Sequence, residues 1–461
     1  MHLKTISLKN YRCFTSLDVN LEPGLTVFVA ENGQGKTAVL DAIACLLGRF
    51  VQHFVPLGLL GLKDEDFHDE WKEDESGNLL KNKREPLLSL SAIVDVTGYP
   101  CWNRLVEAIP WEVTRIRDKS DETRKSTIPY AIASSQLKDF ATAFIEADNA
   151  DTPSPYPILA YYGTNRVGFR QPVNFGRLRE VAYARKECYR TALNGKLNYG
   201  LLVDWLLHVE FQQLRDAKMR GDLYYRSIES LTIEKAIMSI MPGFSNLKAY
   251  DRPTHLEIDF REGDSARRLL VDQQLSDGHK TTLTLVLDIV SRILEANGKL
   301  PGVTPESLLA SKGIILIDEV DLHLHPSWQQ HIIPDLIKTF PNIQFIVTTH
   351  SPQVVSSVPA KSLRVVSHGR VEQASCPTQG VEVATILRGI FGTFPSPQDI
   401  AIVKKLNKFT ALTSQGEWQS SEWRNLYEEL AMYYGRDYGP LKGVIAHKDF
   451  LERISAGASN A

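Results

Sequence analysis

Cysteines are few in this sequence, and none of them shows the spacing of a metal or redox motif. The 461 residues contain five, scattered and odd in number, with no Cys-x-x-Cys pair. Such a set argues against a disulfide framework and against a thiolate zinc site, and it is typical of a reducing compartment. Disulfide bonds and zinc are therefore not expected to stabilise this fold.

Long apolar runs are also missing from the sequence. The apolar stretch at residues 57–62 is far shorter than the about 20 residues that a membrane-spanning helix needs. The first residues lead directly into an alternating pattern at residues 3–8, with no apolar signal region. We therefore expect a soluble, cytoplasmic protein.

The chain has no large excess of charge of either sign. Its 52 Lys and Arg against 55 Asp and Glu give a net charge of −3. This balance neither supports nor excludes nucleic-acid binding, because only a local basic patch matters for that. The length and the 43% hydrophobic content allow a large core and two or three domains or lobes.

Apolar patterning predicts an α/β fold. Strands are predicted at residues 3–8, 25–29, 88–96, 158–162, 256–260, 269–271, 314–317, 345–348 and 363–366. Helices are predicted at residues 36–47 with Gly48 as the C-terminal cap, at 280–296, at 328–340 and over much of 178–241. The alternation of strands and helices in the second half is typical of an α/β sheet.

Other segments carry weaker patterns. Residues 64–86 are charged and predict an exposed loop or hairpin, and residues 120–125 predict a polar loop. One apolar helix face is predicted from Leu201, Leu202, Trp205 and Leu206. The tail beyond residue 380 is mostly helical and rich in Trp and Tyr, which could dock a partner or simply pack its own helices.

A glycine loop at residues 30–37, Ala-Glu-Asn-Gly-Gln-Gly-Lys-Thr, lies between a predicted strand and a predicted helix. Its glycines let the backbone N–H groups face an anion, and the helix N-terminus adds its dipole. Lys36 would reach the β- and γ-phosphates, and the Thr37 hydroxyl would ligate Mg²⁺. The residues expected around ATP are Asn32, Gly33, Gln34, Gly35, Lys36 and Thr37.

A second motif, which is acidic, follows the apolar run at residues 314–317. A buried strand would deliver Asp318 and Glu319 to its carboxyl edge, where ligands bind in open α/β sheets. Asp318 would hold Mg²⁺, and Glu319 would orient or polarise the attacking water. Taken alone, the motif could equally be a strand end with two solvated acids.

Two further motifs could contact phosphate. Ser276 and Gly278 precede a predicted helix and read as an N-cap, which is either a plain cap or a phosphate site. His350 follows another apolar strand, where a lone histidine is often structural. His323 and His325 form a His-x-His pair with no third ligand nearby, a weak metal signal.

The order of these motifs along the chain resembles that of the ABC-type ATPases. That resemblance implies that residues 275–279 form the signature loop, which reaches across a dimer to the γ-phosphate of the opposite subunit. It also implies that His350 senses the γ-phosphate and that Asp321 signals between the two sites. At His279 this family often has Gln, so the chain departs from the pattern there.

The N-terminal pattern Leu-x-Asn-Tyr-Arg-x-Phe at residues 8–14 resembles the RecF/SMC-like branch, which places a residue such as Arg12 against the nucleotide. Residues 317–326 and 340–354 are similar to stand-alone bacterial ATPases of anti-phage defence, among them the PtuA family of Septu and retron-associated systems. The resemblance implies a partner HNH nuclease, PtuB, that the ATPase holds and regulates.

The resemblance also implies an organisation. We expect an ATPase domain at residues 1–375, with core strands and P-loop at 1–50, a β-lobe and insertions at about 51–162, a helical lobe at about 163–250 and the second half of the site at about 251–375. A helical C-terminal region follows at 376–461. The glutamine loop of this family is expected near residues 163–166, where Arg166 is a phosphate ligand or an ordinary surface arginine.

The sequence-based hypothesis is an ATPase whose site forms between two chains placed head to tail. Long heptads are missing between residues 37 and 276, and no Asp-x-Asp follows His350, so neither an SMC coiled coil nor a nuclease is expected. One alternative is a RecF-like DNA-repair clamp on duplex DNA. Another is a nucleotide-gated scaffold with little turnover.

Overall fold

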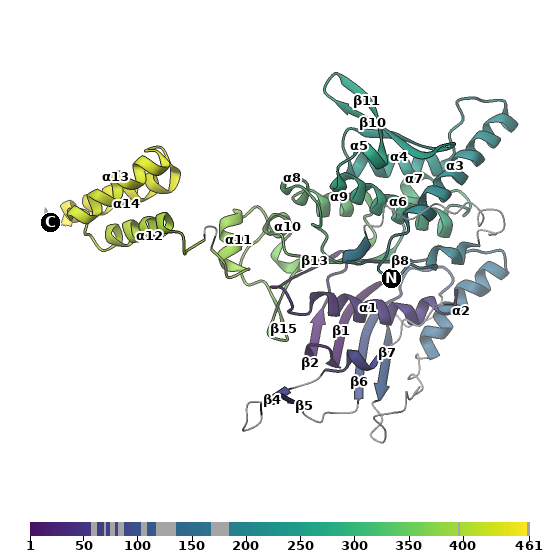
Figure 1. The fold of residues 1–461 in the computed structure, drawn as a ribbon. Helices are drawn as coiled ribbons and strands as arrows, with labels where there is room; N and C mark the ends of the chain where they lie inside the picture. Colours follow the sequence, from purple (N-terminus) through teal and green to yellow (C-terminus); the bar gives the residue numbers. More distant parts are fainter. Residues whose placement is uncertain are drawn as a thin grey trace. The chain divides into compact units, whose positions relative to one another are not determined.

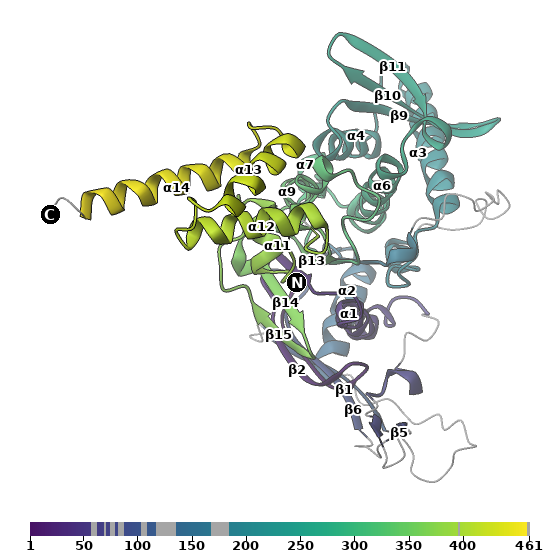
Figure 2. The same cartoon turned by 60° about the vertical axis from the view of Figure 1, so that its left-hand side comes forward.

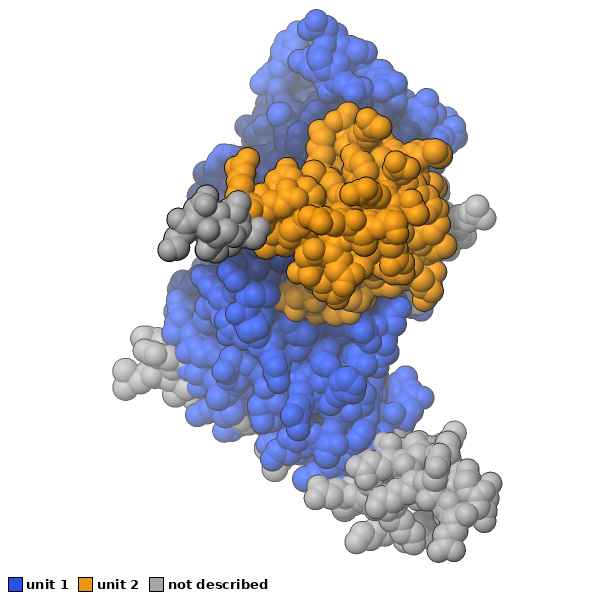
Figure 3. Space-filling model, turned by 90° about the vertical axis from the view of Figure 1, so that its left-hand side faces the viewer, with its two compact units in different colours: residues 1–386 blue, residues 387–461 orange. Residues whose placement is uncertain are grey.

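The structure is a computed structural model of the chain. It describes residues 1–56, 62–68, 71–73, 79–81, 87–102, 108–116, 135–166, 184–394 and 397–458. The chain forms two compact units, residues 1–386 and 387–461, which Figure 3 shows in different colours. None of the described helices is long and apolar enough to cross a membrane.

A six-stranded sheet forms the centre of the first unit. Its order is β15 (Arg370–Gln373), β14 (Leu363–Ser367), β3 (Leu25–Val29), β13 (Ile343–Thr349), β12 (Gly313–Ile317) and β8 (Ile158–Tyr162). All neighbours are parallel except β15 and β14. Every residue of β3, β8, β12 and β13 is buried, which explains their continuous apolar runs and confirms the predicted α/β fold.

A second sheet is antiparallel, with the order β2 (Phe14–Asn20), β1 (His2–Tyr11), β6 (Leu87–Asp95) and β7 (Ala108–Ile116). The helix α1 (Lys36–Val51) contacts strands of both sheets, and Figures 1 and 2 show it between them. Phe50 at its end packs against Trp111 of β7 and against Phe140 and Phe144 of α2 (Ser135–Asn149). These aromatic contacts join the second sheet to the helix that follows the glycine loop.

Packing also explains why one predicted helix end is wrong. The helix α1 does not stop at Gly48 but continues to Val51, with Gln52 as its cap. Phe50 and Val51 are fully buried in the aromatic core, so tertiary contacts hold the last turn in place. A glycine inside a helix costs only about 1 kcal/mol relative to alanine, which this packing offsets.

The predicted helix at 328–340 is also wrong as a single element. It forms two helices, α8 (Pro326–Gln329) and α9 (Ile332–Thr339). Pro334 would lie in the interior of a continuous helix, where it has no N–H for the carbonyl of residue 330. In the first turn of α9 that missing N–H costs nothing.

The remainder of the first unit contains α3 (Tyr199–Arg220), α4 (Ile228–Ile240), α5 (Val271–Gln274), α6 (Asp277–Asn297) and α7 (Pro305–Leu309). A three-stranded antiparallel sheet, β9 (Phe244–Asp251), β10 (Thr254–Glu262) and β11 (Ser265–Leu270), follows α4 (Figure 1). The sequence patterns missed β9, α2 and β2. The short elements are η1 (Asp64–Asp66), η2 (Thr164–Arg166), η4 (Arg185–Tyr189), α10 (Pro352–Ser357) and η5 (Ala360–Ser362).

Two other predictions are partly corrected. In the predicted helical stretch 178–241, the residues between η4 and α3 are not helical. Leu201 is 47% exposed, whereas Leu202, Trp205 and Leu206 are buried. Leu201 lies in the first turn of α3 and lines a cavity there, which leaves its side chain partly accessible.

The charged segment 64–86 includes a confirmed hairpin of β4 (Trp71–Glu73) and β5 (Leu79–Lys81). Asp66 within this segment is buried, so the segment is not exposed throughout. The Gly-Asn pair at 77–78 and the predicted polar loop at 120–125 lie outside the described residues.

Within the second unit, the described residues form three complete helices, α12 (Ala401–Ser414), α13 (Ser421–Tyr434) and α14 (Gly439–Ala458). The helix α11 (Val383–Gly389) precedes them and spans the unit boundary. The core of the second unit consists of Phe409, Leu412, Trp423, Leu426, Leu430 and Leu441. Trp418, Tyr427 and Tyr434 pack against this core, while Tyr433 is 66% exposed. Most of the tail aromatics therefore pack their own helices.

Candidate functional site

Four parallel strands of the central sheet end at one edge, and the predicted site residues follow them. The glycine loop follows β3, His350 follows β13, Asp318 and Glu319 follow β12, and η2 follows β8. Because these strands are neighbours and parallel, residues from widely separated parts of the chain meet at this edge. The fold thus brings together the glycine loop, the acidic motif and His350.

The glycine loop has the backbone that an anion site needs. Gly33 and Gly35 adopt φ values of 79° and 95°, which favour glycine. A Cβ at Gly35 would lie 2.3 Å from the sulfur of Cys13 and 2.8 Å from the Phe14 ring, so no side chain fits there. Gly35 is also the N-cap of α1, where no side chain caps the first N–H groups. These groups are available to a phosphate.

Lys36 is buried within its own loop. Its Nζ donates to the carbonyl oxygens of Ala30 and Glu31, both at 3.0 Å. Burial lowers the pKa of Lys36, and the nearby Asp318, Glu319 and Asp321 act in the opposite direction. The amine therefore lies beside the acidic motif, held by carbonyls that a phosphate could replace.

Thr37 and Asp318, the two predicted metal ligands, are in direct contact. The Thr37 hydroxyl donates to Asp318 Oδ2 at 2.9 Å, and the hydroxyl of Thr348 donates to Asp318 Oδ1 at 2.5 Å. Asp318 is 1% exposed, whereas Thr37 lies at the surface. Hydroxyl and carboxylate oxygens fit Mg²⁺, which binds few protein ligands beside phosphate and water. Among the described residues, no group of three or more His, Cys, Asp or Glu side chains that could hold a metal ion is found.

Two hydrogen bonds fix the backbone of Glu319. It has a φ of 48°, an unusual value for a residue with a side chain, and its N–H donates to the Thr348 hydroxyl at 2.7 Å. Its carbonyl accepts from Arg166 Nη2 at 2.7 Å. Thr348 thus orients both acidic residues, since its hydroxyl also contacts Asp318.

The Arg166 side chain holds the same turn by hydrogen bonds to the backbone carbonyls of the turn. Its guanidinium donates to the carbonyl oxygens of Asp318 and Glu319, and the side chain is only 2% exposed. The interpretation of Arg166 as a surface arginine is therefore wrong. Its N–H groups contact backbone carbonyls here rather than the glycine loop, because β8 ends directly beside β12.

The Ser276 segment forms the predicted N-cap. The Ser276 hydroxyl accepts from the N–H of His279 at 3.3 Å, and Ser276 itself is exposed. The His279 ring lies against the rings of Phe244 and Trp328. The histidine that replaces the family's usual glutamine is therefore packed against aromatic side chains. Among the described residues, no hydrogen bond joins Ser276 to the glycine loop of the same chain.

Gly278 packs against the loop that contains Asp321. A Cβ at Gly278 would lie 2.6 Å from the carbonyl oxygen of His323, so this position accepts only glycine. Asp321 Oδ1 accepts from the hydroxyl of Thr349 at the end of β13. The two loops therefore touch within one chain.

His350 is half-buried beside this cluster. Burial is the main cause that lowers its pKa, and the Lys36 charge acts in the same direction, while Glu319 and Asp321 oppose it. The lowered pKa favours the neutral imidazole, which can present either a donor or an acceptor.

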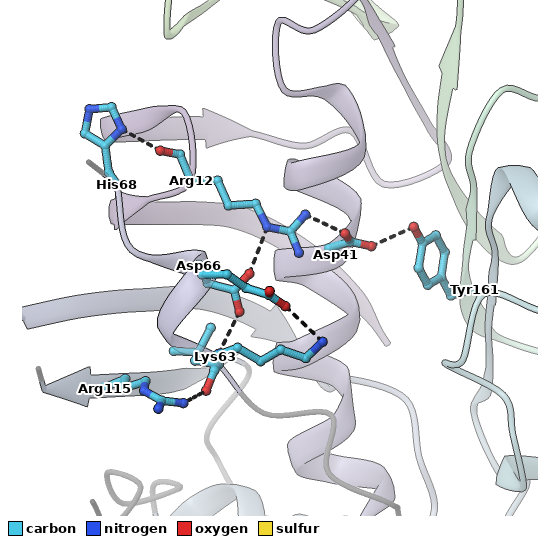
Figure 4. Close-up of polar contacts among 9 residues, drawn as sticks. Arg12, Asp41, Lys63, Asp66, His68, Arg115 and Tyr161 are labelled. Atoms are coloured by element: carbon cyan, nitrogen blue, oxygen red, sulfur yellow. Dashed lines mark hydrogen bonds and ion pairs between the residues drawn. The ribbon is translucent and has the colours of Figure 1, made fainter. Parts of the chain in front are cut away.

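Arg12 lies in a network of acidic side chains (Figure 4). Its guanidinium pairs with Asp41 of α1 at 2.6 Å and with Asp66 of η1 at 2.9 Å. The hydroxyl of Tyr161 donates to the other oxygen of Asp41 at 2.7 Å. In this structure two carboxylates neutralise the charge of Arg12. A contact of Arg12 with nucleotide therefore stays a prediction.

Three structural contributors at the site were missed in the sequence. Thr348 donates to Asp318, Asp41 pairs with Arg12, and Tyr161 donates to Asp41, but no role was predicted for any of these three residues. Gln34, predicted near the nucleotide, accepts from the backbone N–H of His368 at 2.9 Å. The only signal for Thr348 was its place in Thr-Thr-His-Ser-Pro, directly before the predicted sensor histidine.

Comparison with protein families gives two matches. A family model described as "AAA domain" matches residues 5–238, just over half of the chain. A second AAA-domain model, whose description adds "Type IV TA system", matches residues 210–356. The two matches together cover the whole site described above.

Three kinds of curated protein are among those similar to this chain. The chain is 28% identical to "Retron Ec83 probable ATPase" of Escherichia coli, over 95% of this chain and 84% of that protein. It is 28% identical to the Septu protein PtuA of Bacillus mycoides (strain KBAB4), over 45% of this chain and 27% of that protein. It is 33% identical to the DNA replication and repair protein RecF of Streptomyces avermitilis, over 19% of this chain and 24% of that protein.

Among solved structures, the chain is similar to an SMC head bound to the C-terminal winged-helix domain of ScpA. The identity is 16%, the TM-score is 0.45, and the match covers 82% of this chain and 98% of that one.

Proposed function

This chain belongs to the AAA-domain family of ATPases, and from that premise we propose that two copies of it bind and hydrolyse ATP between them. We propose further that the nucleotide state regulates a partner HNH nuclease in bacterial anti-phage defence. The relatives named as a retron ATPase and as Septu PtuA support this assignment.

The observation that carries the proposal is the contact of Thr37 with Asp318. The Thr37 hydroxyl, next to Lys36 of the glycine loop, donates to the buried carboxylate of Asp318 at 2.9 Å. Asp318 follows β12, which is separated from β3 by one strand of the sheet. This pairing is the one that a Mg²⁺–ATP site of P-loop proteins requires. Bound there, Mg²⁺ would neutralise the charge of the phosphates.

The chain's own groups fit the remaining tasks. Lys36 and the uncapped N–H groups of α1 bind phosphate, and Glu319, fixed by Arg166 and Thr348, orients the attacking water. His350 follows the neighbouring strand β13 at the same edge of the sheet. Arg12, which pairs with Asp41 and Asp66, needs to exchange those partners to reach a nucleotide.

A second copy supplies the missing half of the site. Ser276 is exposed at the N-terminus of α6 and has no hydrogen bond to its own glycine loop among the described residues. The N-terminus of a long helix is suited to a phosphate. In the proposed head-to-tail dimer, Ser276 and Gly278 of one copy face Lys36 and Thr37 of the other.

The test is Glu319→Gln, with nucleotide binding and hydrolysis measured separately. Because only the carboxylate's action on water is lost, we expect ATP affinity to persist and kcat to fall by about 10²–10⁴-fold. Glu372→Gln, an exposed change on the edge strand β15, serves as the matched control and leaves both unchanged. Turnover in Glu319→Gln equal to that of the unmodified chain would show that the catalytic assignment is wrong.

The partner is tested separately by affinity purification of the chain from its native host. A stoichiometric HNH protein in the purified complex would support the defence function. Recovery of the chain alone, with ATP-dependent and steeply salt-dependent binding to duplex DNA, would support the RecF-like clamp instead.

A further inference from the structure

A cavity of about 370 Å³ lies in the first unit, between η4, the first turns of α3 and the second half of α6. None of the nucleotide-site residues lines it. Its volume is in the range of small-molecule sites. Its lining residues are Glu187, Arg190, Thr191, Lys196, Asn198, Leu201, Leu202, Asp204, Trp205, Asp288, Ser291, Arg292 and Glu295.

The buried cation of this cavity already has partners. Arg292 pairs with Asp288 one turn earlier in α6, with an Nε–Oδ2 distance of 2.7 Å. Its Nη1 also donates to the carbonyl oxygens of Cys188 and Arg190. Its charge is therefore neutralised within the wall of the cavity and is not available to an anion.

Two acidic side chains of the cavity make no ion pair among the described residues, although the charges of Arg292 and Arg190 act to lower the pKa of Glu295. Asp204 is 6% exposed, and its Oδ1 has no hydrogen-bond partner in the part of the chain that the structure describes. Glu295 makes no ion pair within the same described part. The other cations of the lining lie at its rim, where Arg190 pairs with Glu187 and Lys196 is exposed. Burying carboxylates without partners is costly, so a positive ligand would stabilise the cavity.

The lining also selects the kind of cation. No cluster of three acidic, His or Cys side chains that could hold a metal ion occurs among the described residues, so a multivalent metal has too few ligands. Trp205 and Leu202 give the cavity a buried apolar wall next to Asp204. An alkyl stem with a cationic head fits such a wall, and the indole adds a cation–π contact.

We infer that this cavity binds a small organic cation with an ammonium or guanidinium group. Asp204 and Glu295 accept hydrogen bonds from the cationic head, and Trp205 packs against the stem. The rim residue Leu201, which is 47% exposed, flanks the entrance.

The floor of the cavity is connected with the nucleotide site. The hydroxyl of Tyr162 donates to Asp288 Oδ2 at 2.7 Å, and the carbonyl of Tyr162 accepts from the N–H of Asp318 at 2.8 Å. A cation that drew Asp288 from its present partners would therefore act on the strand that positions Asp318. This regulatory role rests on the proposed ATPase function, whereas the binding itself does not.

The experiment measures binding of agmatine and putrescine to the full chain, without nucleotide, by calorimetry at constant ionic strength. We expect saturable binding at one site per chain. Asp204→Asn and Glu295→Gln each weaken it by about 10–100-fold, because each removes a hydrogen bond between charged groups. Glu210→Gln, a partly buried change on α3 outside this cavity, is the control and keeps the affinity within about twofold.

A second kind of variant distinguishes loss of the binding site from a folding defect. Leu201→Trp places a large side chain at the exposed rim, leaves both carboxylates in place and should reduce binding at least tenfold. Choline, which has no N–H to donate, should bind much more weakly than agmatine. Three outcomes would overturn the inference: no saturable binding of either probe, equal binding of choline, or unchanged affinity in all three cavity variants.

Discussion

Glu295 shows how one half-buried side chain links stability to pH. Burial raises its pKa to about 7, and Asp288 and Glu187 act in the same direction, while Arg292 and Arg190 oppose them. A carboxyl whose pKa is raised on folding holds its proton more tightly in the folded state. Its contribution to stability is therefore lost as the pH rises from the usual carboxyl range to about 7.

Glu295→Gln should remove this loss. We expect the variant to be more stable than the unmodified chain above pH 7, by on the order of 3 kcal/mol at most, and to differ from it by less than about 1 kcal/mol near pH 5. Thermal unfolding of both proteins between pH 5 and 8 measures the difference. Glu306→Gln is the control, since the pKa of this exposed acid is lowered to about 2 and does not titrate in that range. Parallel pH profiles for the Glu295→Gln variant and the unmodified chain would contradict the prediction.

Arg166 is a positioning residue with a separable effect. Arg166→Met keeps much of the buried volume but removes the hydrogen bonds to the carbonyls of Asp318 and Glu319. The turn with the positive φ of Glu319 then loses a restraint, so we expect kcat to fall by about 10–100-fold while ATP affinity changes little. Steady-state kinetics together with equilibrium ATP binding test this. A large loss of affinity with kcat intact would instead mean that Arg166 serves the phosphates.

At the scale of elements, α6 joins two regions of the first unit. Its N-cap Ser276 lies at the proposed dimer face, and its last turns carry Asp288, Arg292 and Glu295 of the cavity. The helix is buried over most of its length, which makes it a stiff connection. Any cation effect on hydrolysis would therefore reach both halves of the site through α6 or through β8.

The C-terminal helices form an element group with its own core, and α13 is its centre. Trp423 packs on Phe409 and Tyr427, and its Nε1 donates to the hydroxyl of Thr413 at 2.7 Å. Trp423→Ala should destabilise the second unit by about 3–5 kcal/mol and leave ATPase activity of the first unit within about twofold. Calorimetric unfolding would show the loss. Met432→Ala, at a position 88% exposed, is the control without effect.

At the scale of the whole molecule, the proposed dimer predicts complementation between two inactive variants. Lys36→Ala removes phosphate binding, and Ser276→Ala removes the group supplied to the opposite copy. A mixed dimer contains one site with both residues intact. With random exchange, half of the dimers are mixed and one of their two sites works, so about a quarter of the activity should return.

The measurement is ATP turnover in an equimolar mixture of the two variants, after incubation that allows subunits to exchange. Each variant alone gives the baseline. Activity that stays at the mean of the two separate proteins would indicate that each site lies within one chain.

The sequence by itself determined the fold class and the motif residues. The strands at β3, β8 and β12 were predicted because strands buried on both faces are continuous apolar runs. Gly33 and Gly35 were recognisable because a left-handed backbone is a local requirement. The N-cap at Ser276 was predicted for the same local reason.

Only the tertiary structure decided which of these residues meet. Thr37 and Asp318 are 281 residues apart in the chain and touch because β13 alone separates their strands. The burial of Arg166 and Asp204 and the raised pKa of Glu295 also depend on distant elements that pack against them. Burial and pairing of a charge are properties of the packed surroundings and not of the local sequence, so no pattern of neighbouring residues could have predicted them.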